Sequence, residues 1–314
     1  MEITLATFVA AIVAMAAPII LAALGETLSE KAGVVNLSLD GAILLSAMAG
    51  FVVAFRTHSL FLGFIAAAAT GAMVAMVLAV VGVWLNQSQV AAGFALAFLC
   101  RDLAYFLGHP YSRQQGPQLA TLPLPGLSDL PFFGQVLFSH SPVVYLSLIA
   151  VPGCLLFLYR SRYGLLLRCA GENPEACWAR GINPTRVRFL AVIAGGLLVG
   201  LAGGAFSLAI KPGWGQPQGC EGIGWIALAL VIFGGWRPLR VAIGAYLFGT
   251  LQLLGIYFQD AFPAIPGQIF QVAPFPLMIF TLILIHLGGK RRGRWSRIFI
   301  APAPKWLGRA YKRV

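Results

Sequence analysis

The sequence contains little charge. Only 10% of its 314 residues are charged and only ten are acidic, whereas 59% are hydrophobic and the mean hydropathy is +0.84. Because a soluble domain carries roughly 25% charged residues, this composition excludes a soluble globular protein and indicates an integral membrane protein with several spans. A net charge of +12 would suggest nucleic acid as a partner of a soluble chain. Here the basic residues are concentrated in a few segments between apolar stretches, so membrane topology explains the charge and no nucleic acid is expected.

Motifs for catalysis and nucleotide binding are also missing. The chain has no G-x-x-x-x-G-K-[ST] phosphate loop, no H-E-x-x-H zinc motif and no G-x-S-x-G nucleophile motif. Its four histidines are scattered, and its five cysteines lie in or near apolar segments without C-x-x-C spacing. We therefore expect neither catalytic residues nor a metal or cofactor on this chain, and we interpret the cysteines as small hydrophobic side chains.

Apolar stretches recur along the chain at about the length that crosses a bilayer, roughly 20 residues. The expected fold class is all-α, a polytopic membrane helical bundle of about nine segments with interrupted helices. Residues 1–289 form the membrane domain, and residues 290–314 form a basic tail. The nine predicted spans, of which the seventh and ninth are short, are 5–24, 34–55, 60–83, 88–107, 142–159, 189–210, 222–236, 241–258 and 272–288.

Basic residues predict the orientation of these spans. Of the 22 lysines and arginines, 17 lie in three clusters: residues 160–188, Arg237 with Arg240, and Lys290 to Arg313. With nine spans all three clusters fall on one side of the membrane, and the positive-inside bias makes that side cytoplasmic. The N-terminus is then expected outside, the C-terminus inside, and residues 108–141 in a long outer loop.

Two polar, glycine-rich stretches interrupt the apolar pattern, at residues 25–41 and 211–224. Irregular backbone at membrane depth is tolerated where it is buried in protein or lines a wet cavity, and broken helices commonly face substrate pathways. A third polar cluster, residues 86–89, opens the fourth span. Ordinary turns and helix caps are the alternative explanation. Glu26 and Glu30 are expected to be loop residues or partner contacts. The predicted pathway residues are Asn36, Ser38, Asp40, Asn86, Gln87, Trp214 and Glu221.

The basic segment 160–188 carries signals for a short helix. Asn173 can cap the helix, Pro174 suits its first position, Glu175 suits its positive end, and Gly181 suits a left-handed stop. Asn183 and the proline after it then begin the next membrane helix. A capped helix on the basic side of a membrane protein predicts a surface that is presented to a partner.

Longer stretches resemble a known family. GETLSEKAGVVNLSLDGAILLSA, LNQSQVAAGFAL, GLLLRCAGENPEACWARGINPTRVRFLAVIAGGLLVGLAGG and GWIALALVIFGGWRPLRVAIGAYLFG follow one another between residues 25 and about 249. They resemble permeases of bacterial ABC importers of the branched-chain amino acid and simple-sugar superfamily, in particular the nucleoside-type subgroup. Glu175-Ala176-Cys177 followed by Gly181 resembles the E-A-A-x-x-x-G coupling motif, with Cys177 in place of the second alanine. Ser38 replaces a glycine of the subgroup, and Ile223 replaces a basic residue.

The resemblance implies a multi-pass permease subunit in the bacterial cytoplasmic membrane. Its implied partners are a paralogous permease, a cytoplasmic ATPase that carries the ATP and magnesium, and an extracytoplasmic solute-binding lipoprotein. The implied solute is a nucleoside, with simple sugars and riboflavin-like ligands next. A secondary transporter or channel, and a membrane-bound enzyme or lipid-handling protein, are the alternatives. The tail is expected either to contact membrane lipid or to be solvated. The residues expected to contact the ATPase are Glu172, Asn173, Glu175, Ala176, Arg180 and Gly181.

Overall fold

The computed structural model describes residues 5–261 and 303–311, together with the single residues 269, 272, 276 and 280. This part of the chain is almost wholly helical, and seven of its helices are long and apolar enough to cross a membrane. Two π-helical turns, η1 (Val80–Trp84) and η3 (Phe206–Ile210), extend α3 and α9. The long helices are α1 (Leu5–Lys31), α2 (Leu39–Thr57), α3 (Leu60–Ala79), α4 (Gln89–Gly108), α6 (Pro142–Arg160), α9 (Pro184–Ala205) and α11 (Pro238–Ala261).

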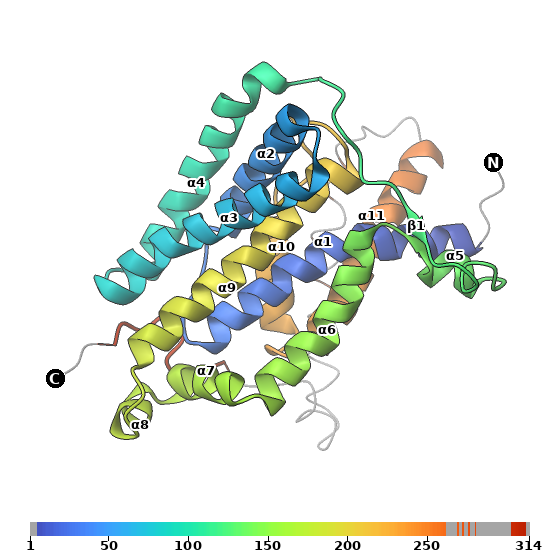
Figure 1. The fold of residues 1–314 in the computed structure, drawn as a ribbon. Helices are drawn as coiled ribbons and strands as arrows, with labels where there is room; N and C mark the ends of the chain where they lie inside the picture. Colours follow the sequence, from blue (N-terminus) through green and yellow to red (C-terminus); the bar gives the residue numbers. More distant parts are fainter. Residues whose placement is uncertain are drawn as a thin grey trace.

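Helices α1 and α9 lie side by side at the centre of the bundle, with α2, α3 and α4 to one side and α6 to the other (Figure 1). Glycines let these helices approach closely. A Cβ atom on Gly195 of α9 would lie 2.4 Å from the carbonyl oxygen of Gly25 in α1, and one on Gly71 of α3 would lie 2.4 Å from that of Gly196. Small residues at such contacts are typical of helix packing in membranes.

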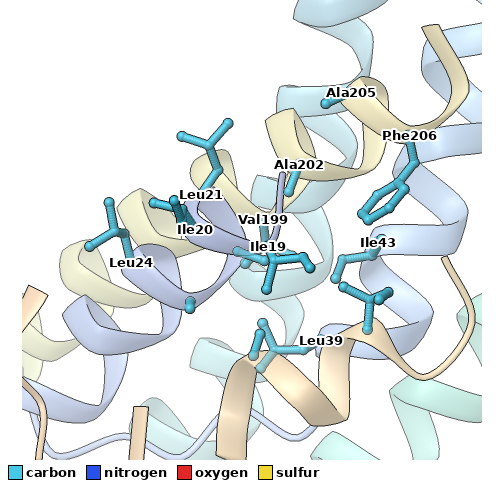
Figure 2. Close-up of a cluster of buried hydrophobic side chains, with 14 of the residues drawn as sticks. Ile19, Ile20, Leu21, Leu24, Leu39, Ile43, Val199, Ala202, Ala205 and Phe206 are labelled. Atoms are coloured by element: carbon cyan, nitrogen blue, oxygen red, sulfur yellow. The ribbon is translucent and has the colours of Figure 1, made fainter. Parts of the chain in front are cut away.

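The apolar core fills the space between these helices. Figure 2 shows Ile19 of α1 close to Leu39 and Ile43 of α2, and to Val199 of α9, with Phe206 at the end of the same cluster. The first four are at most 1% exposed. This core fixes the start of α2 against the middle of α1, and α2 begins directly after the first interrupted segment.

The seventh predicted span is shorter than expected. Residues 222–236 contain α10 (Ile223–Phe233), an 11-residue helix that is about 16 Å long at 1.5 Å per residue. Since the hydrocarbon core is roughly 30 Å thick, α10 alone does not cross it, and 222–236 is not confirmed as a full span. The ninth predicted span, 272–288, lies largely outside the described residues.

Short elements occupy the two ends of α6. At one end lie α5 (Phe133–Leu137) and the antiparallel strands β1 (Leu122–Pro123) and β2 (Ser139–His140), whereas η2 (His109–Tyr111) lies at the end of α4. At the other end, α7 (Arg162–Glu172) and α8 (Pro174–Ala179) project from the bundle (Figure 1). The predicted short helix is therefore present, but the helix α7 before it was not expected.

Candidate functional site

The two interrupted segments meet inside the bundle, where α2 and α10 begin. Asp40, in the first turn of α2, is buried, and its Oδ1 atom accepts a hydrogen bond from the backbone N–H of Gly224 at 3.2 Å. A Cβ atom on Gly224 would lie 2.2 Å from the backbone nitrogen of Asp40, so the contact requires a glycine. Free N–H groups at helix N-termini favour a negative charge. We call this contact the α2–α10 junction.

Glu221 and Trp214 lie on the segment that leads into the junction. The hydroxyl of Tyr105, in α4, donates a hydrogen bond to Glu221 Oε1, and the rings of Tyr105 and Trp214 are 5.7 Å apart. Glu221 also accepts hydrogen bonds from the backbone N–H groups of Gln218 and Gly219, each at 2.6 Å. Burial raises the pKa of Glu221, but these hydrogen bonds outweigh burial and hold the pKa below its ordinary value. The carboxylate is therefore ionised at neutral pH.

A buried glutamine shapes the same segment. Gln218 is 1% exposed, and its Oε1 atom accepts a hydrogen bond from the backbone N–H of Gly215 at 3.0 Å. Its Nε2 atom donates to the carbonyl oxygen of Gly213 at 3.0 Å. One amide side chain thus satisfies backbone groups of the irregular segment, as buried irregular backbone requires.

Helix α4 carries charge in the middle of its length. Arg101 follows Gln89 by 12 residues, which places it about 18 Å along the helix, and both Arg101 and Asp102 are exposed in the single chain. Arg101 is near enough to Asp40 for its positive charge to interact with that carboxylate. It therefore belongs to the surroundings of the junction, although it was not among the predicted pathway residues.

The two outward flanks of α4 differ in chemistry. Residues 94, 98, 101 and 105, spaced as one helical face, are Phe, Phe, Arg and Tyr. Residues 92, 96, 99 and 103, on the opposite flank, are Ala, Leu, Leu and Leu. A charged group at the bilayer centre is costly, so the aliphatic flank suits lipid and the flank with Arg101 does not.

The first interrupted segment is held by α1. Glu26 Oε1 accepts a hydrogen bond from the backbone N–H of Asn36 at 3.1 Å, and Asn36 Oδ1 accepts one from the backbone N–H of Ser38 at the same distance. Glu30 accepts a hydrogen bond from Nε1 of Trp236. Glu26 and Glu30 are at most 1% exposed, so their interpretation as loop residues or partner contacts is wrong, because α1 continues to Lys31.

Asn86 and Gln87 lie elsewhere. Their amide groups donate to the nearby carbonyl oxygens of Trp84 and Leu85, at 3.3 and 3.1 Å. Asn86 lines a hollow of about 550 Å³ whose other walls include Trp178 of α8, Asn183 before α9 and Tyr311. The structure therefore places Asn86 by α8 rather than at the α2–α10 junction.

The amide that contacts the first interrupted segment is Gln89. It is buried, and its Oε1 atom accepts a hydrogen bond from the backbone N–H of Val35 at 3.0 Å. It was noticed in the polar cluster of residues 86–89 but was not selected as a site residue. Burial distinguishes it from its neighbours, and the sequence carries no signal of that burial.

The predicted caps of α8 and α9 are confirmed. Asn173 Oδ1 accepts a hydrogen bond from the backbone N–H of Ala176 at 3.0 Å, Asn183 caps α9, and Gly181 adopts a left-handed conformation with φ +77°. The predicted contact residues are all exposed: Glu172, Asn173, Glu175, Ala176, Arg180 and Gly181.

The sulfur atoms of Cys169, in α7, and Cys177, in α8, lie next to each other. The seven residues between them include the corner between the two helices, and this corner brings their Cα atoms to 6.1 Å. The other three, Cys100, Cys154 and Cys220, are free and buried.

Comparison with known proteins gives a consistent result. Residues 8–285 match the family described as the permease component of the branched-chain amino acid transport system. A putative glucose ABC transporter permease protein, TsgC13 of Haloferax volcanii, is 41% identical over 80% of this chain and 77% of its own length. The guanosine ABC transporter permease protein NupQ of Bacillus subtilis is 31% identical (88% and 91%). The nucleoside ABC transporter permease protein NupC of Lactococcus lactis is 29% identical (90% and 92%). No solved structure matches.

Proposed function

The chain belongs to the family of permease components of branched-chain amino acid transport systems, and from this premise we propose that it imports a solute containing a sugar ring. It is a transport subunit of an ABC transporter and not an enzyme. The relatives are named for glucose, guanosine and nucleosides, which share a polyhydroxylated ring. A nucleoside is the solute that the sequence motifs favour, and a hexose is the second candidate.

The observation that carries the proposal is the α2–α10 junction. Asp40 is bonded there to Gly224, and Glu221, three residues before Gly224, is bonded to Tyr105, whose ring lies beside that of Trp214. Carboxylate oxygens accept hydrogen bonds from sugar hydroxyl groups, and aromatic rings pack against the flat face of a base or a sugar. The proposed pathway passes this junction, with Asn36 and Ser38 supporting the start of α2.

The flank of α4 that carries Arg101 supports the pairing with a second permease subunit. A charged side chain exposed to lipid at the centre of a helix costs about 2.5–3.5 kcal/mol on insertion scales. A paralogous permease that faces this flank across a hydrated path removes that cost. The aliphatic flank, with Leu99 and Leu103, then contacts lipid.

The other partners follow from the family and the charge pattern. The end of the bundle with α7 and α8 carries the arginine-rich segment 160–188, and the positive-inside bias assigns it to the cytoplasm. We propose that α8 docks on an ATPase subunit, which holds ATP and magnesium. An extracytoplasmic lipoprotein delivers the solute to the opposite face, in the bacterial cytoplasmic membrane.

Uptake of labelled guanosine and labelled glucose tests the proposal. Cells that express the chain with its ATPase, second permease and solute-binding lipoprotein should accumulate one of these solutes, and cells that lack the chain should not. Replacing the phosphate-loop lysine of the ATPase should abolish the accumulation. Uptake that persists with the inactive ATPase would instead indicate a secondary transporter or channel. Uptake of neither solute would refute the sugar-ring assignment.

A further inference from the structure

Residues 303–311 return to the bundle at a place where α7 and the turn after α1 already touch each other. The backbone N–H of Trp306 donates to the carbonyl oxygen of Gly171, in α7, at 2.9 Å. The backbone N–H of Gly308 donates to the carbonyl oxygen of Gly33, in the turn after α1, at 3.1 Å. Leu307, between them, packs against the hydrophobic core. The segment therefore contacts both the end of α7 and the first interrupted segment.

Arg188 of α9 completes this connection. Its side chain is 2% exposed, and its Nε and Nη2 atoms donate to the carbonyl oxygen of Ala170 at 3.3 and 3.0 Å. Its Nη1 atom donates to the carbonyl oxygen of Arg309 at 3.1 Å. One planar guanidinium group thus holds α7 and the C-terminal segment in a fixed relation, which a single flexible ammonium group could not do.

The chemistry of Arg188 argues against a role in stability alone. Burying a charged group costs several kcal/mol in desolvation, and an apolar side chain of similar volume often stabilises a fold as well or better. A buried guanidinium that bonds two segments far apart in the sequence is better explained by the geometry that it imposes. Hydrogen bonds with fixed directions specify how α7 sits against residues 303–311.

We propose that Arg188 and residues 303–311 form a strut that holds the end of α7 against the turn at Gly33, where the two elements already touch. Movement of α8 then passes through Gly171 to residues 33–38, and from there to Asp40 at the α2–α10 junction. This inference rests on the proposed function, since it takes α8 as the ATPase contact. A rigid element between two sites is what coupling between them requires.

The contacts of the segment also separate the strut from a lipid anchor. An anchor would lay Trp306 and Tyr311 along the membrane surface. In the structure Trp306 is bonded to α7 through its backbone, and its ring packs edge-on against that of Tyr311 at 6.1 Å. Tyr311 lines the hollow that Trp178 of α8 also lines. The described part of the tail therefore faces the protein.

The test measures solute transported per ATP hydrolysed, with the full chain, its ATPase, the second permease and the binding protein in proteoliposomes. Arg188→Met removes the donors and keeps the length of the side chain. We expect ATP hydrolysis to stay within about twofold of wild type and transport per ATP to fall at least fivefold, the lower end of typical coupling free energies. Arg188→Lys should give an intermediate ratio. Arg186→Met, an exposed arginine of the same helix, is the matched control and should change nothing.

Truncation after Pro302 removes the other half of the strut and should lower the same ratio. An unchanged ratio in both variants, with the complex assembled, would overturn the strut while leaving the proposed function intact. A truncation that lowers only membrane abundance would assign the segment to lipid anchoring and would also overturn it. Failure of both variants to insert would show a folding role instead. Failure of the wild-type chain to bind the ATPase would refute the proposed function itself.

Discussion

Replacing Asp40 tests whether the α2–α10 junction matters for transport. Asp40→Ala removes the Oδ1 atom that accepts the hydrogen bond from Gly224 and leaves a buried N–H group at the start of α10 without a partner. An unsatisfied buried donor costs about 1–3 kcal/mol. Loss of the negative charge at two helix N-termini adds about 0.3–1 kcal/mol.

A cost of this size is large for a conformational equilibrium. If α2 and α10 must stay joined in one of the two access states, 1–3 kcal/mol changes the population of that state about 5- to 150-fold. We therefore expect the maximal uptake rate of Asp40→Ala to fall by at least about fivefold. Asp40→Asn keeps an oxygen acceptor for Gly224, so it should lose only the charge term and retain more activity than Asp40→Ala.

The assay is the initial rate of solute uptake at saturating concentration and matched membrane abundance, together with denaturant unfolding of the purified chain. Asp129→Ala is the matched control, because Asp129 is exposed in the loop before α5. An exposed substitution of this kind is expected within about 0.5 kcal/mol of wild type. Equal uptake and equal unfolding free energy for Asp40→Ala and Asp129→Ala would refute the reasoning.

Three further substitutions test other contacts. Gly181→Val places a β-branched residue at φ +77° after α8; ATP hydrolysis should continue while uptake is lost, and normal uptake would contradict the coupling role. Glu221→Gln should lower the thermal unfolding temperature at pH 7. Because the pKa of Glu221 is depressed in the fold, the stabilisation from its carboxylate is complete above the ordinary pKa of about 4.3. This stabilisation disappears as the pH falls through the lower folded pKa, so the unfolding temperatures of wild type and variant should converge in acid. Trp236→Phe removes the Nε1–H donor to buried Glu30 and should lower the unfolding free energy by about 1–3 kcal/mol, whereas Trp225→Phe should lower it less.

Local signals in the sequence predicted local structure well. The caps of α8 and α9 depend on residues within a few positions of each other, such as Asn173 with Ala176. Apolar runs of sufficient length predicted most of the candidate membrane-spanning helices. Glu26 and Glu30 were misjudged because polar residues normally end an apolar helix, and their hydrogen-bond partners Asn36 and Trp236 are 10 and 206 residues away. A sequence pattern within one helical turn does not predict a hydrogen-bond partner that far away in the chain.

The sequence predicted individual residues of the candidate site but not the contacts that bring them together. Asp40 and Glu221 were selected because each lies in a polar break, but the bond from Gly224 to Asp40 spans 184 residues and the bond from Tyr105 to Glu221 spans 116. Tyr105 was not selected, although Arg101 lies one turn before it on the same face of α4. The position of Asn86 beside α8 depends in the same way on how α3, α9 and the C-terminal segment pack.

The bonding at the junction bears on where solute selectivity resides. Both oxygens of Glu221 already accept hydrogen bonds from Tyr105 or the backbone, and one oxygen of Asp40 is bonded to Gly224. A solute in the proposed pathway would exchange existing hydrogen bonds for new ones, so its net gain in free energy is small. Translocation requires binding that is strong enough for entry and weak enough for release. A junction whose polar groups are already paired meets the second condition, and discrimination between a nucleoside and a hexose then depends on the binding protein that delivers the solute.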